Sequence, residues 1–316
     1  MIVITGANGF VGRSLARALE RRGLDVTGVV RQPQSKFVGR EWVFDQPDFD
    51  GIAEHWPNWA KCEAVVHLAA RVHVMKDHAV DPLDAYRQTN VCGTLRVAEA
   101  AARAGASRFV YVSSIKAIGE SSAGIAPLSE RDEPKPLDPY GISKLEAEIA
   151  LREFGCRSGL EIVVVRPPLV YGPGVRANFL SLMDAVAKGK PLPVGAISAR
   201  RSLIFVENLA DALAHCVLDA PAAGETFHVA DSRDPSVAEL VRLIGRALDV
   251  QPRLIPVPVS WLRAAGRLTG RMAQIERIAG ELRIDTTHIS NVLGWTPPFD
   301  LEAGLRQTAV WYRSNR

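Results

Sequence analysis

The sequence has few cysteines, and their spacing argues against two kinds of stabilising site. Four are present among 316 residues, and no two form a C-x-x-C pair. Zinc sites need closely spaced cysteines, and disulfide frameworks are typical of small secreted domains. We therefore expect no metal site, and we expect reduced packing residues of a cytoplasmic protein at Cys62, Cys92, Cys156 and Cys216.

The chain also lacks long apolar runs and a strong charge of either sign. Its longest apolar stretches, such as residues 162–165 and 255–262, end well before the ~18 residues that a membrane-spanning helix requires. The formal net charge is +3, and Lys and Arg are spread along the sequence. The N-terminus has no basic segment ahead of its apolar residues, which is typical of a first strand and not of a targeting segment. We expect neither a nucleic-acid partner nor membrane insertion.

Short runs of β-branched residues alternate with amphipathic segments over the first half of the chain. This pattern predicts strands at 2–5, 25–30, 42–44, 64–68, 109–113 and 162–166, with helices at 11–22, 83–104 and 140–154. Hydrophobic residues make up 47% of the sequence, enough for a large core. The expected fold class is α/β, a doubly wound parallel sheet with helices on both faces.

Three glycines follow the first predicted strand and open the first predicted helix. Gly6, Gly9 and Gly12 have the spacing G-x-x-G-x-x-G. Glycine permits a tight turn and lets backbone amides approach a pyrophosphate at the positive end of the helix dipole. In this strand-to-helix context the motif predicts dinucleotide binding and makes the expected sheet Rossmann-like.

Two residues bear on the choice of dinucleotide. Arg31 stands at the end of the second predicted strand, where an Asp would bind the ribose hydroxyls of NAD. An Arg there can pair with a 2′-phosphate, so the sequence favours NADP, with NAD as the alternative. Asp45, after the third strand, is expected to contact the adenine or to serve as a turn residue.

The second half of the chain has a different texture. After residue 166, prolines interrupt the sequence and helix-like segments at 179–188, 206–218, 237–248 and 301–313 outnumber strands. We expect a dinucleotide-binding domain at 1–166 and a smaller, mostly helical substrate domain at 167–316. A segment at about 200–230 is expected to return to the first domain, with the ligand cleft between the two.

A tyrosine and a lysine at the start of a predicted helix form the candidate catalytic pair. Tyr140 and Lys144 are four residues apart and therefore share a helix face. A phenol pKa near 10 must fall by about 3 for acid–base work at neutral pH, and an ammonium at about 4 Å supplies roughly that stabilisation. We expect Lys144 to lower the pKa of Tyr140. Ser114, after strand 109–113, is expected to hydrogen-bond the reacting oxygen, because the carboxyl ends of the strands face the ligand.

Further motifs follow in order: His67-Leu68-Ala69-Ala70, Asn90-Val91-Cys92-Gly93-Thr94, and the segments 166–174, 201–206 and 293–297. With the glycine turn, the serines and the Tyr-Lys pair, they make the whole chain resemble extended short-chain dehydrogenases/reductases, the NAD-dependent epimerase/dehydratase family. The chain resembles the nucleotide-sugar 4-epimerase and 4-ketoreductase type, and it looks most like bacterial 4-ketoreductases that make 6-deoxy-N-acetylhexosamine nucleotides. The resemblance implies a nucleotide-sugar substrate and a homodimer formed through helices 83–104 and 140–154.

The resemblance also implies roles for individual residues. Tyr140 would be the acid/base, Lys144 would bind the nicotinamide ribose, and Ser114 would orient the substrate oxygen. Asn178 and Arg201 would hold the nucleotide diphosphate, with a surface role as the alternative for each. The residues expected at the cofactor are Gly6, Asn8, Gly9, Phe10, Val11, Gly12, Arg31, Asp45, Leu68, Ala69, Ala70, Asn90, Ser113, Tyr140, Lys144 and Pro167, with Asn90 also supporting the active-site helix.

The sequence departs from the family pattern on the sugar side. Residues 117–119 read Ala-Ile-Gly where many members have Val-Tyr-Gly, Lys116 precedes them, and Asn208 replaces a common Asp. The loop 71–76 is not that of a typical glucose/galactose epimerase. A dehydratase is disfavoured because Ile115 and Lys116 place no carboxylic acid beside Ser114.

Three functions follow from these observations. The leading hypothesis is NADPH-dependent reduction of a UDP-linked 4-keto-6-deoxy-N-acetylhexosamine for surface polysaccharide synthesis. The alternative is a UDP-hexose 4-epimerase acting on UDP-glucose or UDP-N-acetylglucosamine. A weaker alternative is a non-catalytic NADP-binding sensor, against which an intact set of Ser114, Tyr140 and Lys144 argues.

Overall fold

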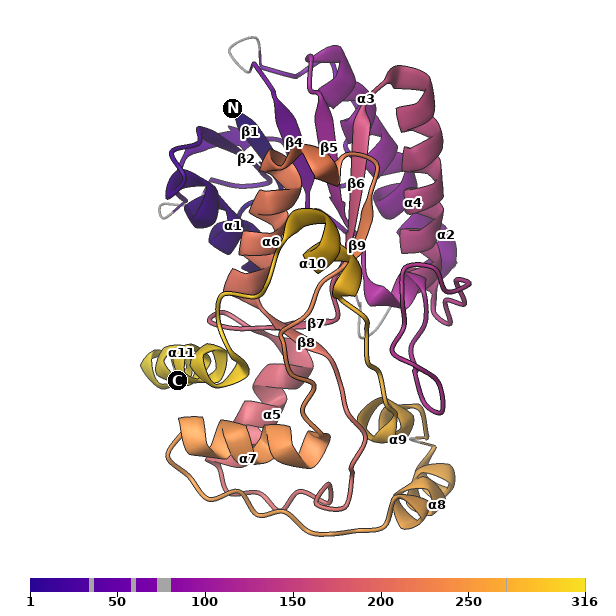
Figure 1. The fold of residues 1–316 in the computed structure, drawn as a ribbon, viewed down its shortest axis with the longest axis vertical. Coiled ribbons are helices and arrows are strands. Elements are labelled where there is room, and N and C mark those ends of the chain that lie inside the picture. The colour runs from indigo at the N-terminus through magenta and orange to yellow at the C-terminus, as the bar shows by residue number, and fades with distance from the viewer. Residues whose placement is uncertain (34–36, 58–60, 73–80, 271, 316) are drawn as a thin grey trace.

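Seven parallel strands form one sheet in the upper part of the molecule (Figure 1). The computed structural model describes residues 1–33, 37–57, 61–72, 81–270 and 272–315. Across the sheet the strands are β3 (Arg40–Val43), β2 (Val26–Val30), β1 (Ile2–Thr5), β4 (Ala64–His67), β5 (Arg108–Val112), β6 (Glu161–Arg166) and β9 (Thr226–His228). The order reverses between β1 and β4, the place where such sheets bind ligands. The predicted Rossmann-like doubly wound sheet is confirmed.

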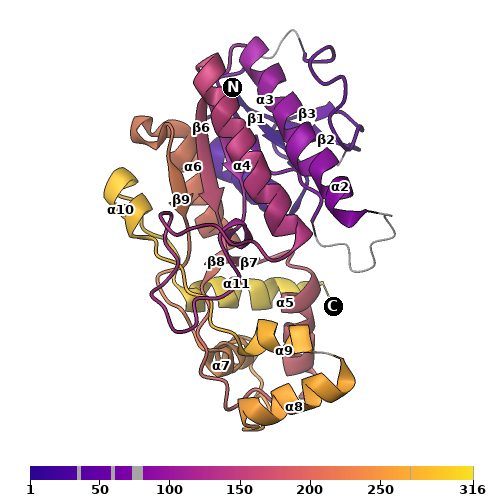
Figure 2. The same ribbon diagram turned by 90° about the vertical axis from the view of Figure 1, so that its right-hand side faces the viewer.

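Helices cover both faces of this sheet (Figures 1 and 2). One face carries α1 (Phe10–Glu20) and α6 (Val206–Leu218), and the other carries α3 (Gly93–Arg103) and α4 (Pro139–Ser158). Along β6, Val163 and Val165 join the first of these cores, whereas Ile162 and Val164 join the second. The strands are apolar on both sides because both sides are buried.

The helix predicted at 83–104 is interrupted. It consists of α2 (Pro82–Arg87), a π-helical turn η1 (Gln88–Cys92) and α3. The prediction of one uninterrupted α-helix was wrong at this turn. Such turns are frequent at functional sites, and this one contains the fully buried Asn90.

The chain after residue 166 contributes to both layers. β9 joins the upper sheet and α6 packs against one face of it, whereas most later elements form the lower region (Figure 1). These are β7 (Leu169–Tyr171), α5 (Ala177–Ala187), β8 (Leu203–Phe205), α7 (Val237–Ala247), α8 (Val259–Thr269), α9 (Met272–Ala279) and α11 (Leu301–Ser314); α10 (Thr287–Leu293) and the 3₁₀ turns η2 (Ile115–Ala117) and η3 (Ala220–Ala222) complete the structure. Strands β7 and β9 were not predicted from sequence patterns; each has three residues and owes its place to the strand it pairs with, β8 or β6.

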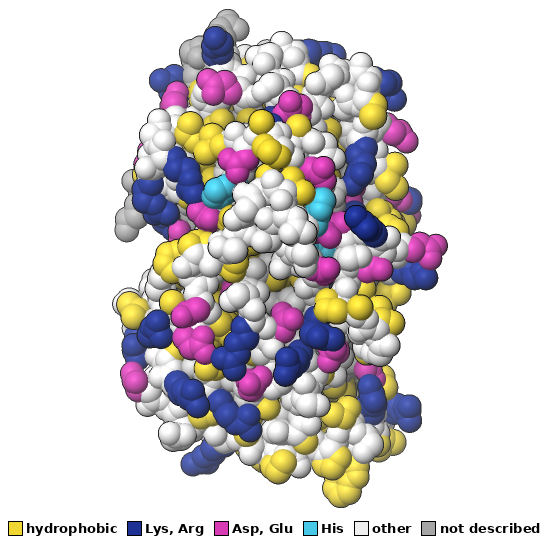
Figure 3. Space-filling view, viewed as in Figure 1, with side chains coloured by type: hydrophobic (Ala, Val, Ile, Leu, Met, Phe, Trp, Pro, Cys, Tyr) yellow, Lys and Arg dark blue, Asp and Glu magenta, His cyan; other side chains and the backbone are white. Residues whose placement is uncertain are grey.

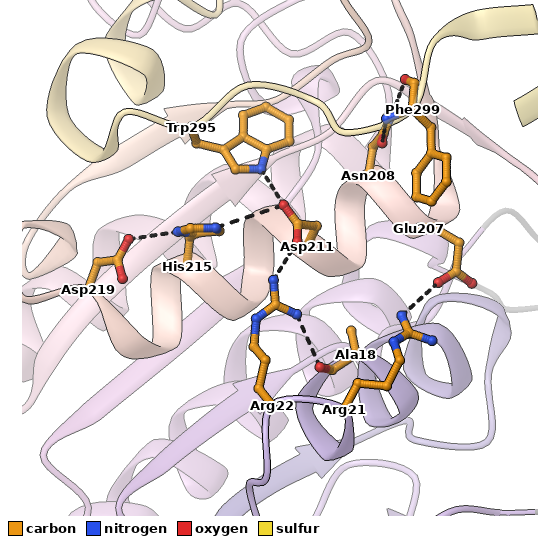
Figure 4. A network of polar contacts seen from close by, with 10 residues as sticks. All are labelled: Ala18, Arg21, Arg22, Glu207, Asn208, Asp211, His215, Asp219, Trp295 and Phe299. Atoms are coloured by element: carbon orange, nitrogen blue, oxygen red, sulfur yellow. Dashed lines mark hydrogen bonds and ion pairs between the residues drawn. The ribbon is translucent and has the colours of Figure 1, made fainter. Parts of the chain in front are cut away.

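Polar contacts tie α6 to α1 and to the C-terminal segment (Figure 4). Asp211 accepts hydrogen bonds from Arg22 and, at 2.9 Å, from Trp295 Nε1. Asn208 uses both ends of its amide on Phe299, donating to the carbonyl oxygen at 2.9 Å and accepting from the N–H at 3.0 Å. The C-terminal segment is therefore fastened to the helix that covers the sheet.

Other sequence predictions concern the surface and the cysteines. Within the residues described, no helix has both the length and the hydrophobicity to span a membrane. Side chains of both charges are interspersed on the face seen in Figure 3. Cys62 and Cys216 are buried, but Cys156 is exposed, so the packing prediction was wrong for Cys156. It lies outside the face of α4 that buries Lys144, Ala147, Glu148 and Leu151.

Candidate active site

The glycine turn lies at the carboxyl end of β1, beside the point where the strand order reverses. Gly6 has a φ of +66°, in the left-handed region that favours glycine. A Cβ on Gly6 would lie 3.0 Å from the backbone nitrogen of Ala69, and one on Gly12 would lie 2.4 Å from the carbonyl oxygen of Gly6. Backbone therefore approaches backbone closely on both sides of the turn.

The N-terminus of α1 has no anion of its own. Its N-cap residue, Gly9, has no capping side chain, and the first turn contains no acidic residue. The first N–H groups of a helix lack intrahelical acceptors and carry partial positive charge. The cradle made by residues 6–12 thus fits the pyrophosphate of a dinucleotide in both shape and charge.

A buried histidine supports the segment opposite this turn. His67 Nδ1 lies 2.8 Å from Thr5 Oγ1, and its Nε2 lies 3.1 Å from Thr94 Oγ1. Thr5 Oγ1 also accepts from the N–H of Ala69 at 3.2 Å. Burial lowers the pKa of His67 to about 3, so the ring is neutral. In the sequence, His67 is only part of a motif; the buried network shows that it positions residues 68–70 beside the glycine turn.

Arg31 and Asp45 are exposed residues that follow β2 and β3. Parallel strands end on one edge of the sheet, so both residues lie on the edge that carries the glycine turn. Asp45 accepts from Gln46 Nε2 at 3.4 Å. Their contacts with a cofactor stay predictions.

The structure brings Tyr140, Lys144 and Ser114 together at the end of β5. Helix α4 starts at Pro139, which places Tyr140 in its first turn. Lys144 Nζ lies 5.9 Å from the centroid of the Tyr140 ring and donates to the carbonyl oxygen of Val112 at 2.8 Å. The side chains of Tyr140 and Ser114 are hydrogen-bonded to each other. A phenol, an ammonium and a hydroxyl thus converge on one place.

The pKa values in this cluster correct the expectation that Lys144 lowers the pKa of Tyr140. Burial raises the pKa of Tyr140, and the carboxylate of Asp138 raises it further, whereas the hydrogen bond with Ser114 lowers it. Burial also lowers the pKa of Lys144 to about 7. Lys144 does not offset the burial of Tyr140, because its Nζ is directed to Val112 and lies over the phenol ring.

Asn90 connects the first turn of α4 to the segment after β4. Its Nδ2 donates to Ser143 Oγ at 3.0 Å and to the carbonyl oxygen of Arg71 at 3.1 Å, and its Oδ1 accepts from the Arg71 N–H at 2.8 Å. Ser143 Oγ in turn donates to the carbonyl oxygen of Tyr140 at 2.8 Å. One buried amide therefore fixes the backbone that carries the phenol. Residues 73–76 of the loop 71–76 lie outside the described residues.

Ser113 and Pro167 lie directly beyond β5 and β6. Ser113 Oγ donates to Glu148 Oε1 at 2.5 Å, and Glu148 forms a buried ion pair with Arg166, whose Nη2 lies 2.5 Å from Oε2. The carbonyl oxygen of Pro167 accepts from the N–H of Ile115 at 3.0 Å. The Glu148–Arg166 pair was not predicted from the sequence, although Glu148 follows Lys144 by four residues on the same helix face. Cofactor contacts of Ser113 and Pro167 stay predictions.

The two residues expected at the diphosphate lie in the lower region. Arg201 Nη1 donates to the carbonyl oxygens of Arg277 at 2.8 Å and Gly280 at 2.7 Å, at the end of α9. Burial lowers the pKa of Arg201. Asn178 is exposed in the first turn of α5. Phosphate binding by either residue stays a prediction.

The chain is similar to known proteins over its full length. The model of a family described as NAD dependent epimerase/dehydratase matches residues 2–230. The UDP-glucose 4-epimerase of Vibrio cholerae is 40% identical over 310 residues, which cover 98% of this chain and 94% of that protein. The GDP-6-deoxy-D-mannose reductase of Pseudomonas aeruginosa is 27% identical, covering 96% and 94%.

Solved structures share the fold. The UDP-glucose 4-epimerase of Thermotoga maritima with UDP-glucose superimposes with a TM-score of 0.79 at 24% identity, covering 99% of this chain and 98% of the other. At that identity the similarity shows the fold alone. MoeE5 in complex with UDP-glucose and NAD has a TM-score of 0.77 at 27% identity, with coverages of 99% and 98%.

Proposed function

This chain belongs to the NAD-dependent epimerase/dehydratase family, and on that basis we propose that it is a UDP-hexose 4-epimerase working with bound NAD. The observation that carries the proposal is 40% identity, over 98% of the chain, to a UDP-glucose 4-epimerase. The substrate we propose is UDP-glucose or UDP-N-acetylglucosamine. This reverses the order of our two leading sequence hypotheses, because the reductase reported above, the GDP-6-deoxy-D-mannose reductase of Pseudomonas aeruginosa, is 27% identical.

The proposed chemistry is oxidation of C4 followed by reduction from the opposite face. Tyr140 removes the proton of the C4 hydroxyl and later returns it to the same oxygen, which Ser114 holds by a hydrogen bond. NAD, bound at the glycine turn, supplies the hydride acceptor and donor. Lys144 stays beside the phenol, where its Nζ is held by the carbonyl oxygen of Val112. Asn90 and Ser143 keep the first turn of α4 in place through both half-reactions.

A 4-ketoreductase is the second candidate, and Arg31 favours it. An exposed arginine after β2, with no carboxylate at the position that would repel a 2′-phosphate, suits NADPH. In this case Tyr140 donates a proton to the keto oxygen of a UDP-linked 4-keto-6-deoxy-N-acetylhexosamine. A non-catalytic NADP sensor is the weakest candidate, because a sensor has no need of the contact between Ser114 and Tyr140.

One purification separates the three functions. The protein is denatured, the released nucleotide is identified, and the native protein is then incubated with UDP-glucose or UDP-N-acetylglucosamine without added cofactor. We expect released NAD and conversion to the corresponding galactose epimer without net cofactor consumption. Stoichiometric oxidation of NADPH with a 4-keto sugar nucleotide, and no epimer, would replace this function with the reductase. Dinucleotide binding with neither epimerisation nor NADPH oxidation would support the non-catalytic sensor.

A homodimer through α3 and α4 is part of the same proposal. Ile149 on α4 is 50% exposed, a large apolar side chain on the outer side of this helix. We expect light scattering to report a dimer, and we expect Ile149→Glu to shift it towards monomer because a charge would be buried there. A wild-type monomer would contradict this assembly.

A further inference from the structure

Lys116 joins two acidic side chains at the start of α4. Its Nζ lies 2.5 Å from Asp138 Oδ2 and 3.1 Å from Glu120 Oε1. The three side chains are only 20–22% exposed. Partially buried ion pairs attract each other more strongly than pairs in open solvent. Removal of one partner is also more costly, because it leaves the other charge poorly solvated.

Asp138 connects this lysine to the helix that carries the candidate acid/base. Its Oδ1 accepts from the N–H of Gly141 at 2.7 Å and caps α4, while Oδ2 binds Lys116. Asp138 is also two residues from Tyr140. Its charge is one of the causes that raise the pKa of this phenol.

The backbone of Lys116 makes a second connection. Its N–H donates to Ser114 Oγ at 3.3 Å. A Cβ on Gly141 would lie 2.5 Å from the carbonyl oxygen of Lys116, so η2 and the first turn of α4 are in direct backbone contact. The lysine therefore lies between the serine that holds the reacting oxygen and the turn that presents the phenol.

We propose that Lys116 is a positioning residue for the acid–base step: its ammonium neutralises Asp138 beside Tyr140, and its backbone keeps Ser114 against the phenol. The inference rests on the proposed function of Tyr140. Lys116 stands where a dehydratase would need a carboxylic acid. A cation at this position instead compensates the charge of Asp138, the carboxylate that caps α4.

The charge next to the phenol should therefore depend on this pair. Within the part of the chain that the structure describes, other titratable or charged groups near Tyr140 include Lys144 on α4, Tyr86 on α2 with its ring centroid 6.1 Å away, Tyr111 on β5, and Arg71 over the Tyr86 ring. Without Lys116, the negative charge of Asp138 would face Tyr140 uncompensated. Without the charge of Asp138, Lys116 would remain paired with Glu120, and the phenol would lose the carboxylate that disfavours its ionised form.

The test is a double-mutant cycle read through the pH dependence of kcat/KM. We expect Lys116→Met to move the acidic limb of the profile to higher pH by about one pH unit, and Asp138→Asn to move it to lower pH by a similar amount. Asn at 138 can still cap the helix. The double variant should return most of the way to the wild-type profile, because the two changes act on one charge balance.

Controls distinguish this role from a purely structural one. Lys135 pairs with Glu133 at 3.0 Å, with both side chains more than 70% exposed, so Lys135→Met should leave the profile in place. Lys116→Arg should restore it. Lower kcat without displacement of the limb, or displacement in the same direction for Lys116→Met and Asp138→Asn, would overturn the proposal. If Lys116→Met does not fold, Asp138→Asn alone decides, since an unmoved or raised limb contradicts it.

A second measurement needs no turnover. The chain has 5 tyrosines, so the Cζ resonance of Tyr140 can be assigned by its loss in Tyr140→Phe. In carbon-13 NMR titrations, the Tyr140 phenol should ionise at lower pH in Asp138→Asn and at higher pH in Lys116→Met than in wild type. If Tyr140→Phe retains near-normal activity, the proposed function fails. If it is inactive and the profiles and NMR titrations of the Lys116 and Asp138 variants match wild type, only the role of Lys116 fails.

Discussion

Lys144 Nζ donates to the carbonyl oxygen of Val112 at 2.8 Å and so ties the middle of α4 to the end of β5. The same ammonium lies 4.6 Å from the ring centroid of Tyr111 and 5.9 Å from that of Tyr140. Burial lowers its pKa to about 7, so both protonation states are accessible near neutral pH. The ammonium and the phenol of Tyr140 are thus held by strand and helix, and their reactivity depends on that geometry.

Replacement of the phenol is the most direct test of the chemistry. Tyr140→Phe should reduce turnover at least ~100-fold and leave cofactor affinity nearly unchanged, because only the proton-transfer group is lost. Steady-state kinetics and NAD titration measure the two effects. Tyr86→Phe, which keeps the ring 6.1 Å from that of Tyr140, serves as the matched control and should retain most activity. Near-normal turnover in Tyr140→Phe would remove this residue from the mechanism.

The second prediction concerns the cofactor. Arg31→Asp should weaken NADP binding at least ~10-fold relative to NAD, because a carboxylate repels a 2′-phosphate and accepts from ribose hydroxyls. Calorimetric titration of the cofactor-stripped protein with each dinucleotide measures the ratio. Equal changes in affinity for NAD and NADP would mean that Arg31 does not contact the 2′-phosphate.

The third prediction tests the contacts that Asn208, on α6, makes with Asp231 and Phe299. Asn208 Nδ2 donates to Asp231 Oδ1 at 2.7 Å and to the carbonyl oxygen of Phe299 at 2.9 Å, and burial raises the pKa of Asp231. Asn208→Asp would place two buried carboxyl groups together and remove both donors. We expect the free energy of unfolding to fall by about 3–5 kcal/mol, measured by urea denaturation. Asn291→Asp, at an exposed position on α10, should change it by less than ~0.5 kcal/mol. Equal free energies of unfolding for the Asn208 and Asn291 variants would mean that the Asn208 contacts do not stabilise the fold.

The fourth prediction is a pH dependence of stability. His67 and His228 are fully buried, and burial lowers the pKa of each from 6.5 to about 3. Between those values the unfolded chain binds protons that the folded chain does not. Stability is therefore fully present above pH 6.5 and is lost as pH falls, by about 1.4 kcal/mol per pH unit for each histidine well below 6.5.

Substitution of one histidine should reduce this slope. Urea denaturation of His67→Gln at several values between pH 7 and pH 4 is expected to show a weaker decline than wild type. His55→Gln is the matched control, because His55 is exposed and hydrogen-bonds the carbonyl oxygen of Gly51. An unchanged slope in His67→Gln would mean that His67 is not kept neutral by the fold.

Several features of the candidate site could be predicted because they depend on short spacings. Gly6, Gly9 and Gly12 between a strand and a helix indicate a turn whose backbone accepts an anion. Tyr140 and Lys144 share a helix face because four residues make about one turn. The order of strands and helices likewise indicates a doubly wound sheet, and the six strands predicted from alternation are all present.

Other features join residues that are distant in sequence. Asn90 and Ser143 are 53 positions apart, and Lys116 and Asp138 are 22 apart. A short edge strand such as β9 lies in the sheet only because β6 is there to pair with it. No local periodicity specifies such pairings, since each depends on how complete elements pack.

What the sequence by itself determined is the set of chemical groups and the elements that carry them: a glycine turn, a phenol, an ammonium and a hydroxyl on an α/β fold. Tertiary structure alone decided their protonation and orientation. It buries Tyr140 and Lys144, directs Lys144 to Val112, and pairs Asp138 with Lys116 close enough to the phenol for its charge to act on Tyr140. The physical reason is that a pKa depends on burial and on distances to other charges, and both exist only after the chain has folded.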